Sequence, residues 1–286
     1  MQGRLFSIAC VVAVFSGCAE SPPSPPLSVA AQTPLGKGFD RAKSGSIAGD
    51  VVWVGAIPRV APFRSIPTPF SDQPPMLARD YSNPNSPVID PASGAVGSAV
   101  VFLRSVDSER SRPWDLEPAR VELVDQRIEV HQGTHRGPVG FVRVGDAVEI
   151  VSRDPLFHSI QGRGASFFAR TMPTPDEVRT RTLSKPGVVE LQSGAGYFWM
   201  RGYLLVADHP YHVHADARGK FLLKDVPAGE YDLVAWHPDW RVSRSMRNPD
   251  SARIQQVTYR EPMQASRRVV VEAGKTTSAR LELSSR

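Results

Sequence analysis

Cysteine is nearly absent from this sequence. The chain of 286 residues has two cysteines, Cys10 and Cys18, and none follows residue 18. The rest of the chain therefore has no disulfide and no thiolate metal ligand of its own. A protein without disulfides has to be stabilised by its hydrophobic core, and a chain of this length is long enough to bury one.

Several functional patterns are missing as well. The formal net charge is +5, but the basic residues are scattered, without a stripe that alternates with aromatics, so we expect no nucleic-acid partner. The sequence also lacks a serine at a strand–elbow–helix turn, a glycine-rich phosphate loop and a paired-carboxylate motif. These absences predict that the protein is not an enzyme.

The first twenty residues indicate export. Arg4 precedes an apolar run from Leu5 to Phe15 that is too short to span a bilayer. The "FSGC" that ends this segment resembles the bacterial lipobox, in which cleavage exposes a cysteine that is then lipid-modified. The resemblance implies a signal peptide over 1–17, loss of Cys10, and a lipid on Cys18 that anchors the protein to a bacterial membrane. An ordinary secretory signal cut nearby is the alternative.

Composition divides the remainder of the chain. Residues 18–43 are rich in proline, serine and alanine, cannot bury apolar surface, and are predicted to form an extended tether. Residues 44–120 combine β-patterned sequence with a long proline-rich loop over 57–97. Two further β domains are expected, over 121–206 and 207–286.

From residue 46 onward the pattern is that of an all-β protein. Short runs such as "SIAGDVVWV", "AVEIVS" and "YDLVAW" are rich in valine, leucine and aromatics, and turn residues bound them. Many short strands separated by glycine and proline turns are typical of sandwiches and barrels. The segment "TPDEVRTRTL" is an exception, because Thr174 as a cap and Pro175 at the first position favour one or two helical turns.

Residues 121–206 resemble the cupredoxin-like domains of exported bacterial proteins. The similar pieces are "VRVGDAVEIVSRDPLFHSI", "PGVVELQ" and "WMRGYLLVADHPY". The resemblance implies a Greek-key sandwich in which a D-P-x-x-H turn supplies the first copper ligand, at His158. Copper-binding relatives take their other ligands from a cysteine, a histidine three residues later and a methionine three later. Those positions are Gly194, Tyr197 and Met200 here.

This set of residues predicts that the copper site is lost. A blue-copper site needs a thiolate and two imidazoles, with methionine only a weak axial partner. Gly194 offers no ligand atom, and the Tyr197 phenol keeps its proton near neutral pH. We therefore expect no cofactor, with His158 bonded to backbone in its turn and Met200 filling the core.

Residues 208–240 resemble the carboxypeptidase regulatory-like module, a small transthyretin-like β-sandwich. The stretch "ADARGKFLLKDVPAGEYDLVAWHPDW" carries the resemblance, which implies turns at Gly219 and Gly229 and core positions for Phe221 and Tyr231. "SGSIAGDVVWVGAIP" resembles an opening strand of the same module type, and "RRVVVEAGKTTSARLELS" its closing strands. Together the resemblances predict a cupredoxin-like sandwich packed with this second sandwich.

The stretch "DHPYHVHAD" gathers His209, His212 and His214. In a strand, residues 212 and 214 would project to one face about 7 Å apart, a spacing that suits Cu(II), Ni(II) or Zn(II) at an exposed site. The alternative is a solvated polar face. A metal-binding or electron-transfer protein that uses His158, His212 and His214 thus stays open beside the copper-free interpretation.

Aromatic residues offer a last functional hint. The "YFWM" loop, Tyr211, Trp236 and Trp240 either present a surface to a glycan or fill the interface between the two β units, and the alternation of Trp199 and Tyr203 favours the interface. The sequence as a whole predicts a non-catalytic, lipid-anchored cell-envelope protein that acts as a binding or structural module. Its expected partners are the membrane, through the lipid, and an envelope protein or polysaccharide.

Overall fold

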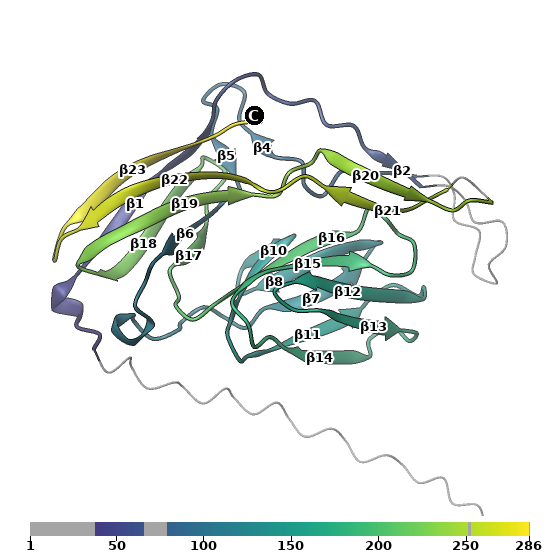
Figure 1. The fold of residues 1–286 in the computed structure, drawn as a ribbon, viewed down its shortest axis with the longest axis horizontal. Coiled ribbons are helices and arrows are strands. Elements are labelled where there is room, and N and C mark those ends of the chain that lie inside the picture. Colours follow the sequence, from purple (N-terminus) through teal and green to yellow (C-terminus); the bar gives the residue numbers. More distant parts are fainter. Residues whose placement is uncertain (1–37, 66–78, 251–252, 286) are drawn as a thin grey trace, which may run out of the picture. The chain divides into compact units, whose positions relative to one another are not determined.

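Strands dominate the fold (Figure 1). The computed structural model describes residues 38–65, 79–250 and 253–285. Helical structure in these ranges is limited to two short 3-10 turns, η1 (Arg41–Lys43) and η2 (Ser108–Arg110), and no helix there has the length and apolar character needed to cross a bilayer. The all-β prediction is confirmed. Cys10, Cys18, the predicted signal peptide and most of the predicted tether lie outside the described residues.

One sandwich, called the inserted sandwich below, consists of two five-stranded sheets. One sheet has the order β10-β16-β15-β12-β13 and the other β14-β11-β7-β8-β9. The strands are β7 (Arg120–Val124), β8 (Arg127–Gln132), β9 (His135–Gly137), β10 (Val139–Arg143), β11 (Ala147–Ser152), β12 (His158–Gly164), β13 (Phe168–Met172), β14 (Val178–Thr182), β15 (Gly187–Ser193) and β16 (Arg201–Ala207).

Alternating residues explain why these segments form a sandwich. In β7 the side chains of Val121 and Leu123 are buried, and in β15 those of Val189 and Leu191 are buried in the same core. Successive side chains of a strand point to opposite faces, so each strand turns one apolar row inward. Burial of each such side chain contributes about 1.5–3 kcal/mol relative to leaving it exposed.

A second sandwich, called the split sandwich, takes its strands from both sides of the inserted one in the sequence. Its sheets have the orders β18-β1-β23 and β17-β6-β19-β22. The strands are β1 (Ser44–Trp53), β6 (Val100–Arg104), β17 (His212–His214), β18 (Lys220–Pro227), β19 (Gly229–His237), β22 (Met263–Val271) and β23 (Thr276–Leu283). β1 thus pairs antiparallel with β18 and parallel with β23, although most of the chain separates it from both.

The pairing of β1 with β23 depends on one glycine. A Cβ atom at Gly49 would lie 1.7 Å from the carbonyl oxygen of Ala279 and 2.9 Å from the ring of Phe221. No side chain fits in that space. On the same strand Ile47 and Val51 are fully buried in the core of the split sandwich, so β1 is held by packing as well as by its two neighbours.

A small apolar cluster joins the two sandwiches. Phe141 and Tyr203 of the inserted sandwich pack there with Val100 and Trp236 of the split sandwich. The rings of Tyr203 and Trp236 meet edge to face, with their centroids 5.4 Å apart. The Tyr203 hydroxyl also accepts a hydrogen bond of 2.8 Å from Nδ2 of Asn85. These two aromatics therefore fill an interface between β units.

Three two-stranded sheets complete the described fold. They are β2 (Phe63–Arg64) with β3 (Asp80–Tyr81), β4 (Val88–Ile89) with β5 (Val96–Gly97), and β20 (Val242–Arg247) with β21 (Ile254–Tyr259). The buried guanidinium of Arg201 donates to the side chain of Gln192 on β15 and to the carbonyl of Val257 on β21. Arg201 therefore ties the β20–β21 hairpin to the inserted sandwich.

The helical prediction for "TPDEVRTRTL" is wrong. Residues Val178–Thr182 form β14, an edge strand antiparallel to β11. Asp176 has a φ of 64°, in the left-handed region, so a helical turn that started at Thr174 would end there. The β-branched residues Val178, Thr180 and Thr182 then favour the strand.

Candidate functional site

The imidazole of His158 lies at the start of β12, inside the inserted sandwich. Its side chain is 0% exposed, and Nε2 lies 2.9 Å from Oδ2 of Asp154, four residues earlier in the turn. Asp154 also accepts hydrogen bonds from the backbone N–H groups of Asp125, at 2.7 Å, and Gln126, at 2.9 Å. The expected backbone partner of His158 is thus replaced by a buried carboxylate.

The surroundings of Asp154 keep it charged. Burial alone would raise the pKa of its carboxyl group, but the hydrogen bonds from His158 and from the two backbone amides outweigh burial and hold that pKa below its ordinary value. Because the carboxylate only accepts, it fixes which edge of the imidazole faces it. The other nitrogen of His158, Nδ1, is buried and has no hydrogen-bond partner among the described residues.

Two other predicted site residues lie near this histidine or in the same core. The ring of Tyr197 has its centroid 5.1 Å from that of His158, and burial raises the pKa of the Tyr197 phenol. Met200 is buried in the same hydrophobic core. Met172 on β13, which the sequence did not suggest, is the cross-strand partner of His158 and is fully buried. The imidazole is thus buried beside the ring of Tyr197, in a part of the sandwich whose core includes both methionines.

At the end of β15 the residue on the inner face is Ser193, whereas the sequence suggested Gly194. Ser193 pairs with the core residue Ile160, and it follows Val189 and Leu191 by two-residue steps, so its side chain is on the inner face. A Cβ atom at Gly194 would instead lie 2.8 Å from Ser159 Oγ and 2.9 Å from Gln161 Nε2. Gly194 is therefore directed away from the inner face. Counting the alternation along "VVELQS" would have found Ser193.

These residues do not fit a type-1 copper ion. That site needs a thiolate and two imidazoles. The residues that the structure places at this end are one imidazole, a phenol whose pKa is raised, a serine on the inner face and thioethers. Among the described residues there is also no group of three or more His, Cys, Asp or Glu side chains able to hold a metal ion.

His212 and His214 lie in a second place, at the junction of the two sandwiches. Both project from β17. His212 is 7% exposed, and His214 is half-buried, with both of its ring nitrogens shielded from solvent. The ring of His212 stacks on Phe102, with centroids 5.4 Å apart, and on His209, at 4.9 Å. The ring of His214 stacks on that of His135 from β9, at 3.6 Å.

Together these side chains form a column of stacked rings. Phe141 contacts both His212 and His214 and so links the two stacks. We call this set the histidine column; its members are Phe102, His135, Phe141, His209, His212 and His214. The expected solvated face at residues 212 and 214 is wrong, because the column buries them against apolar rings.

Burial keeps the imidazoles of the column neutral. Desolvation lowers the pKa of His212 to about 3 and that of His214 to about 3. It also lowers the pKa of His135 and of His209. Nδ1 of His212, both ring nitrogens of His214 and Nε2 of His135 have no partner with good hydrogen-bond geometry in the described structure, although the backbone of Ser98 and of Val139 lies near enough to His214 to offset a part of its pKa shift. No ring contact of the described residues connects His158 to the column.

The tryptophans that the sequence suggested for a glycan are covered. Trp199 is 6% exposed and stacks on Tyr81, with centroids 4.6 Å apart and an interplanar angle of 15°. Trp240 is half-buried against Trp53, with centroids 5.7 Å apart. Trp199 thus lacks the exposure that stacking on a sugar needs, and the ring of Trp240 is partly covered by Trp53 and by the guanidinium of Arg241.

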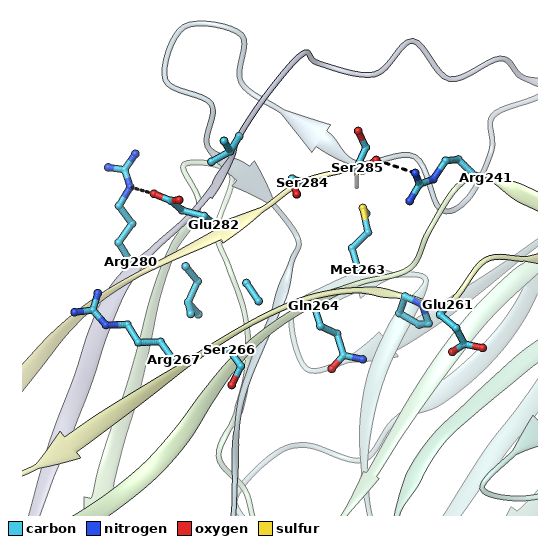
Figure 2. A pocket seen from close by; sticks show the side chains of 14 residues that line it. Arg241, Glu261, Met263, Gln264, Ser266, Arg267, Arg280, Glu282, Ser284 and Ser285 are labelled. Carbon is cyan, nitrogen blue, oxygen red and sulfur yellow. Dashed lines mark hydrogen bonds and ion pairs between the residues drawn. The ribbon is translucent and has the colours of Figure 1, made fainter.

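A shallow groove of about 980 Å³ runs along β22 and β23 of the split sandwich (Figure 2). Its charged groups are largely paired with one another or with backbone. Arg280 Nε lies 3.8 Å from Glu282 Oε1, and Arg241 donates to the carbonyl of Ser285 at 2.8 Å (Figure 2). The groove therefore lacks a field of one sign that would select a charged ligand.

No protein-family model matches the chain, and no curated protein matches it either. Solved structures do resemble part of it. A copper-containing nitrite reductase from Thermus scotoductus SA-01 aligns with 19% identity and a TM-score of 0.26, over 34% of this chain and 24% of that one.

Smaller copper proteins align over most of their own length. A point mutant of amicyanin in its Cu(I) form aligns with 18% identity and a TM-score of 0.25, over 37% of this chain and 97% of amicyanin. A purple cupredoxin from Nitrosopumilus maritimus aligns with 17% identity and a TM-score of 0.24, over 31% of this chain and 98% of that one. The chain thus has weak structural similarity to cupredoxins over about a third of its length, which assigns neither a family nor an activity.

Proposed function

We propose that the chain is an exported, lipid-anchored protein of a bacterial cell envelope, in which a cupredoxin-like sandwich without type-1 copper acts as a non-catalytic binding or structural module. The observation that carries this proposal is the His158 end of the inserted sandwich. One imidazole nitrogen is held by Asp154, and Ser193 lies on the inner face where β15 ends. A serine hydroxyl is a hard, weak ligand in comparison with a thiolate.

The neighbouring phenol supports the same proposal. Tyr197 would have to lose its proton to become an anionic ligand, and burial raises its pKa from an ordinary value near 10. Both cysteines of the sequence precede residue 38, and one of them is the proposed lipid site, Cys18. The lipid supplies the contact with the membrane, and the partner is an envelope protein or polysaccharide, not a nucleic acid.

Copper titration tests the proposal. The full chain in neutral detergent is titrated with Cu(II), and visible spectra are recorded at each addition. We expect no intense thiolate-to-copper band at any ratio. A strong band near one equivalent of copper would overturn the copper-free function. Metal analysis of the protein purified from its native envelope gives an independent reading of the same point.

A second candidate function, metal binding or electron transfer, is favoured by the histidine column. Its imidazoles carry several ring nitrogens without partners, and imidazole is a common ligand of copper, nickel and zinc. Such a site would use the two imidazoles of His212 and His214 without His158, because no group of three or more His, Cys, Asp or Glu side chains among the described residues could hold a metal ion. Calorimetric titration of Ni(II) and Cu(II) into the wild type and into a His212→Ala, His214→Ala double variant tests it. Equal, weak heats for both proteins would exclude this candidate.

A further inference from the structure

A separate cavity of about 280 Å³ opens beside β8 and β9 of the inserted sandwich. Its floor is apolar, because Ile128 and Met200 line it and both are buried. The stacked rings of Tyr81 and Trp199 form one wall. Pockets for drug-sized ligands begin at about 300 Å³, so this cavity suits a smaller molecule, of about one ring.

Tyr81 in this wall is packed against two side chains. Its ring stacks on that of Trp199, and the guanidinium of Arg79 lies 4.9 Å from the ring centroid. Burial raises the pKa of Tyr81, so its hydroxyl stays neutral. The wall is therefore an uncharged aromatic surface next to the apolar floor.

Two arginines stand at the rim. Arg127 has one ion pair, to Asp125 at 3.8 Å, but that carboxylate is already bound by both terminal nitrogens of Arg79, at 2.6 Å each. Arg136 contacts the ring of His131, and no ion pair joins it to a carboxylate of the described residues. The rim thus carries two guanidinium groups that are paired only weakly, or not at all, with carboxylates of the described residues.

The carboxylate of Glu129 limits the negative charge that a ligand of this cavity can carry. Glu129 also lines it, with Oε2 3.4 Å from Nε2 of His131. A ligand with a single anionic group can meet the arginines and keep its apolar part near the floor. A second anionic group on so small a molecule would approach Glu129 and be repelled.

We propose that this cavity binds a small organic monoacid, with its carboxylate between Arg127 and Arg136 and a flat apolar ring over Ile128 and Met200. Arginine and carboxylate form short, charge-assisted hydrogen bonds that are often bidentate. The inference rests on the proposed role of the protein as a binding module, and it names the class of ligand.

Calorimetric titration of the full chain in neutral detergent tests the proposal, with benzoate as the probe. Benzamidine has the same ring with the opposite charge, and acetate has the charge without the ring. We expect saturable binding of benzoate and little or none of benzamidine or acetate. Each of the variants Arg127→Gln and Arg136→Gln should bind benzoate at least about tenfold more weakly. Arg244→Gln, in the exposed strand β20, is the matched control and should leave binding unchanged.

Equal binding of benzoate and benzamidine, or equal affinity in the wild type and both rim variants, would overturn the proposal. Circular dichroism of each variant checks that the fold is kept. The copper titration tests the proposed function independently of benzoate binding to the cavity. A copper band together with benzoate binding would defeat the proposed function and leave the cavity assignment intact, and the absence of both would defeat the cavity alone.

Discussion

Buried histidines have different surroundings inside the inserted sandwich and at its junction with the split sandwich. His158 has a buried carboxylate within hydrogen-bond distance, and that carboxylate is itself held by two backbone amides. His212 and His214 have apolar rings around them, and most of their ring nitrogens have no partner. The same residue type is thus fixed in one place by hydrogen bonds and in the other by stacking.

The two environments differ in how they respond to mutation and to acid. A buried imidazole beside an ionised carboxylate belongs to a polar network that is costly to break, because each deleted partner leaves another buried polar group exposed to a low dielectric. A buried imidazole among rings has no charge nearby to stabilise its protonated form. The first place is therefore sensitive to mutation and the second to acid.

The largest expected effect comes from removing the carboxylate. Asp154→Ala leaves Nε2 of His158 and two backbone N–H groups without their acceptor, so we expect a loss of about 3–5 kcal/mol in the free energy of unfolding. Urea denaturation followed by tryptophan fluorescence measures it. Asp80→Ala removes an exposed carboxylate that pairs with Arg64 and should cost no more than about 1 kcal/mol. Equal losses for the two variants would contradict a special role for Asp154.

Acid should act on the histidine column. The unfolded chain binds protons on His212 and His214 below about pH 6.5, whereas burial keeps both unprotonated in the folded chain down to a pKa of about 3. The unfolded state thus binds more protons between these values, and stability falls as the pH falls. From pH 6.5 to pH 5 the loss is about 2 kcal/mol for each histidine.

Phenylalanine variants isolate this effect. His214→Phe keeps an aromatic ring against His135 and Phe141 but cannot be protonated, so it should remove about 2 kcal/mol of the difference in unfolding free energy between pH 6.5 and pH 5. Urea titrations at the two pH values measure the difference. Val242→Ala, an exposed change on β20 outside the column that removes no titratable group, serves as control and should keep the wild-type dependence. An unchanged dependence in His214→Phe would show that the column does not stay neutral.

The sequence predicts much of this contrast between the two histidine environments, but not all of it. The D-P-x-x-H turn placed His158, and period-two alternation predicted the strands. The distance of four residues from Asp154 to His158 was available too, but only the folded turn shows that the carboxylate replaces a backbone partner. The sequence did not predict that the ring of His214 stacks on His135. His135 comes from β9, far away in the chain, and the two residues meet only where the sandwiches join.

The smallest expected effect on stability concerns Ser193, at the end of β15. Ser193→Cys changes one atom on the inner face of β15 and should alter stability by less than about 1 kcal/mol. Because that thiol would point to the inner face of the sheet, we expect it to react slowly with a water-soluble thiol reagent, with the wild type as the background for the native cysteines. Gly194→Cys is the matched control: its Cβ would point at Ser159 and Gln161, on the other face, so its thiol should react faster. A faster reaction of Ser193→Cys than of Gly194→Cys would reverse the assignment of faces at the end of β15.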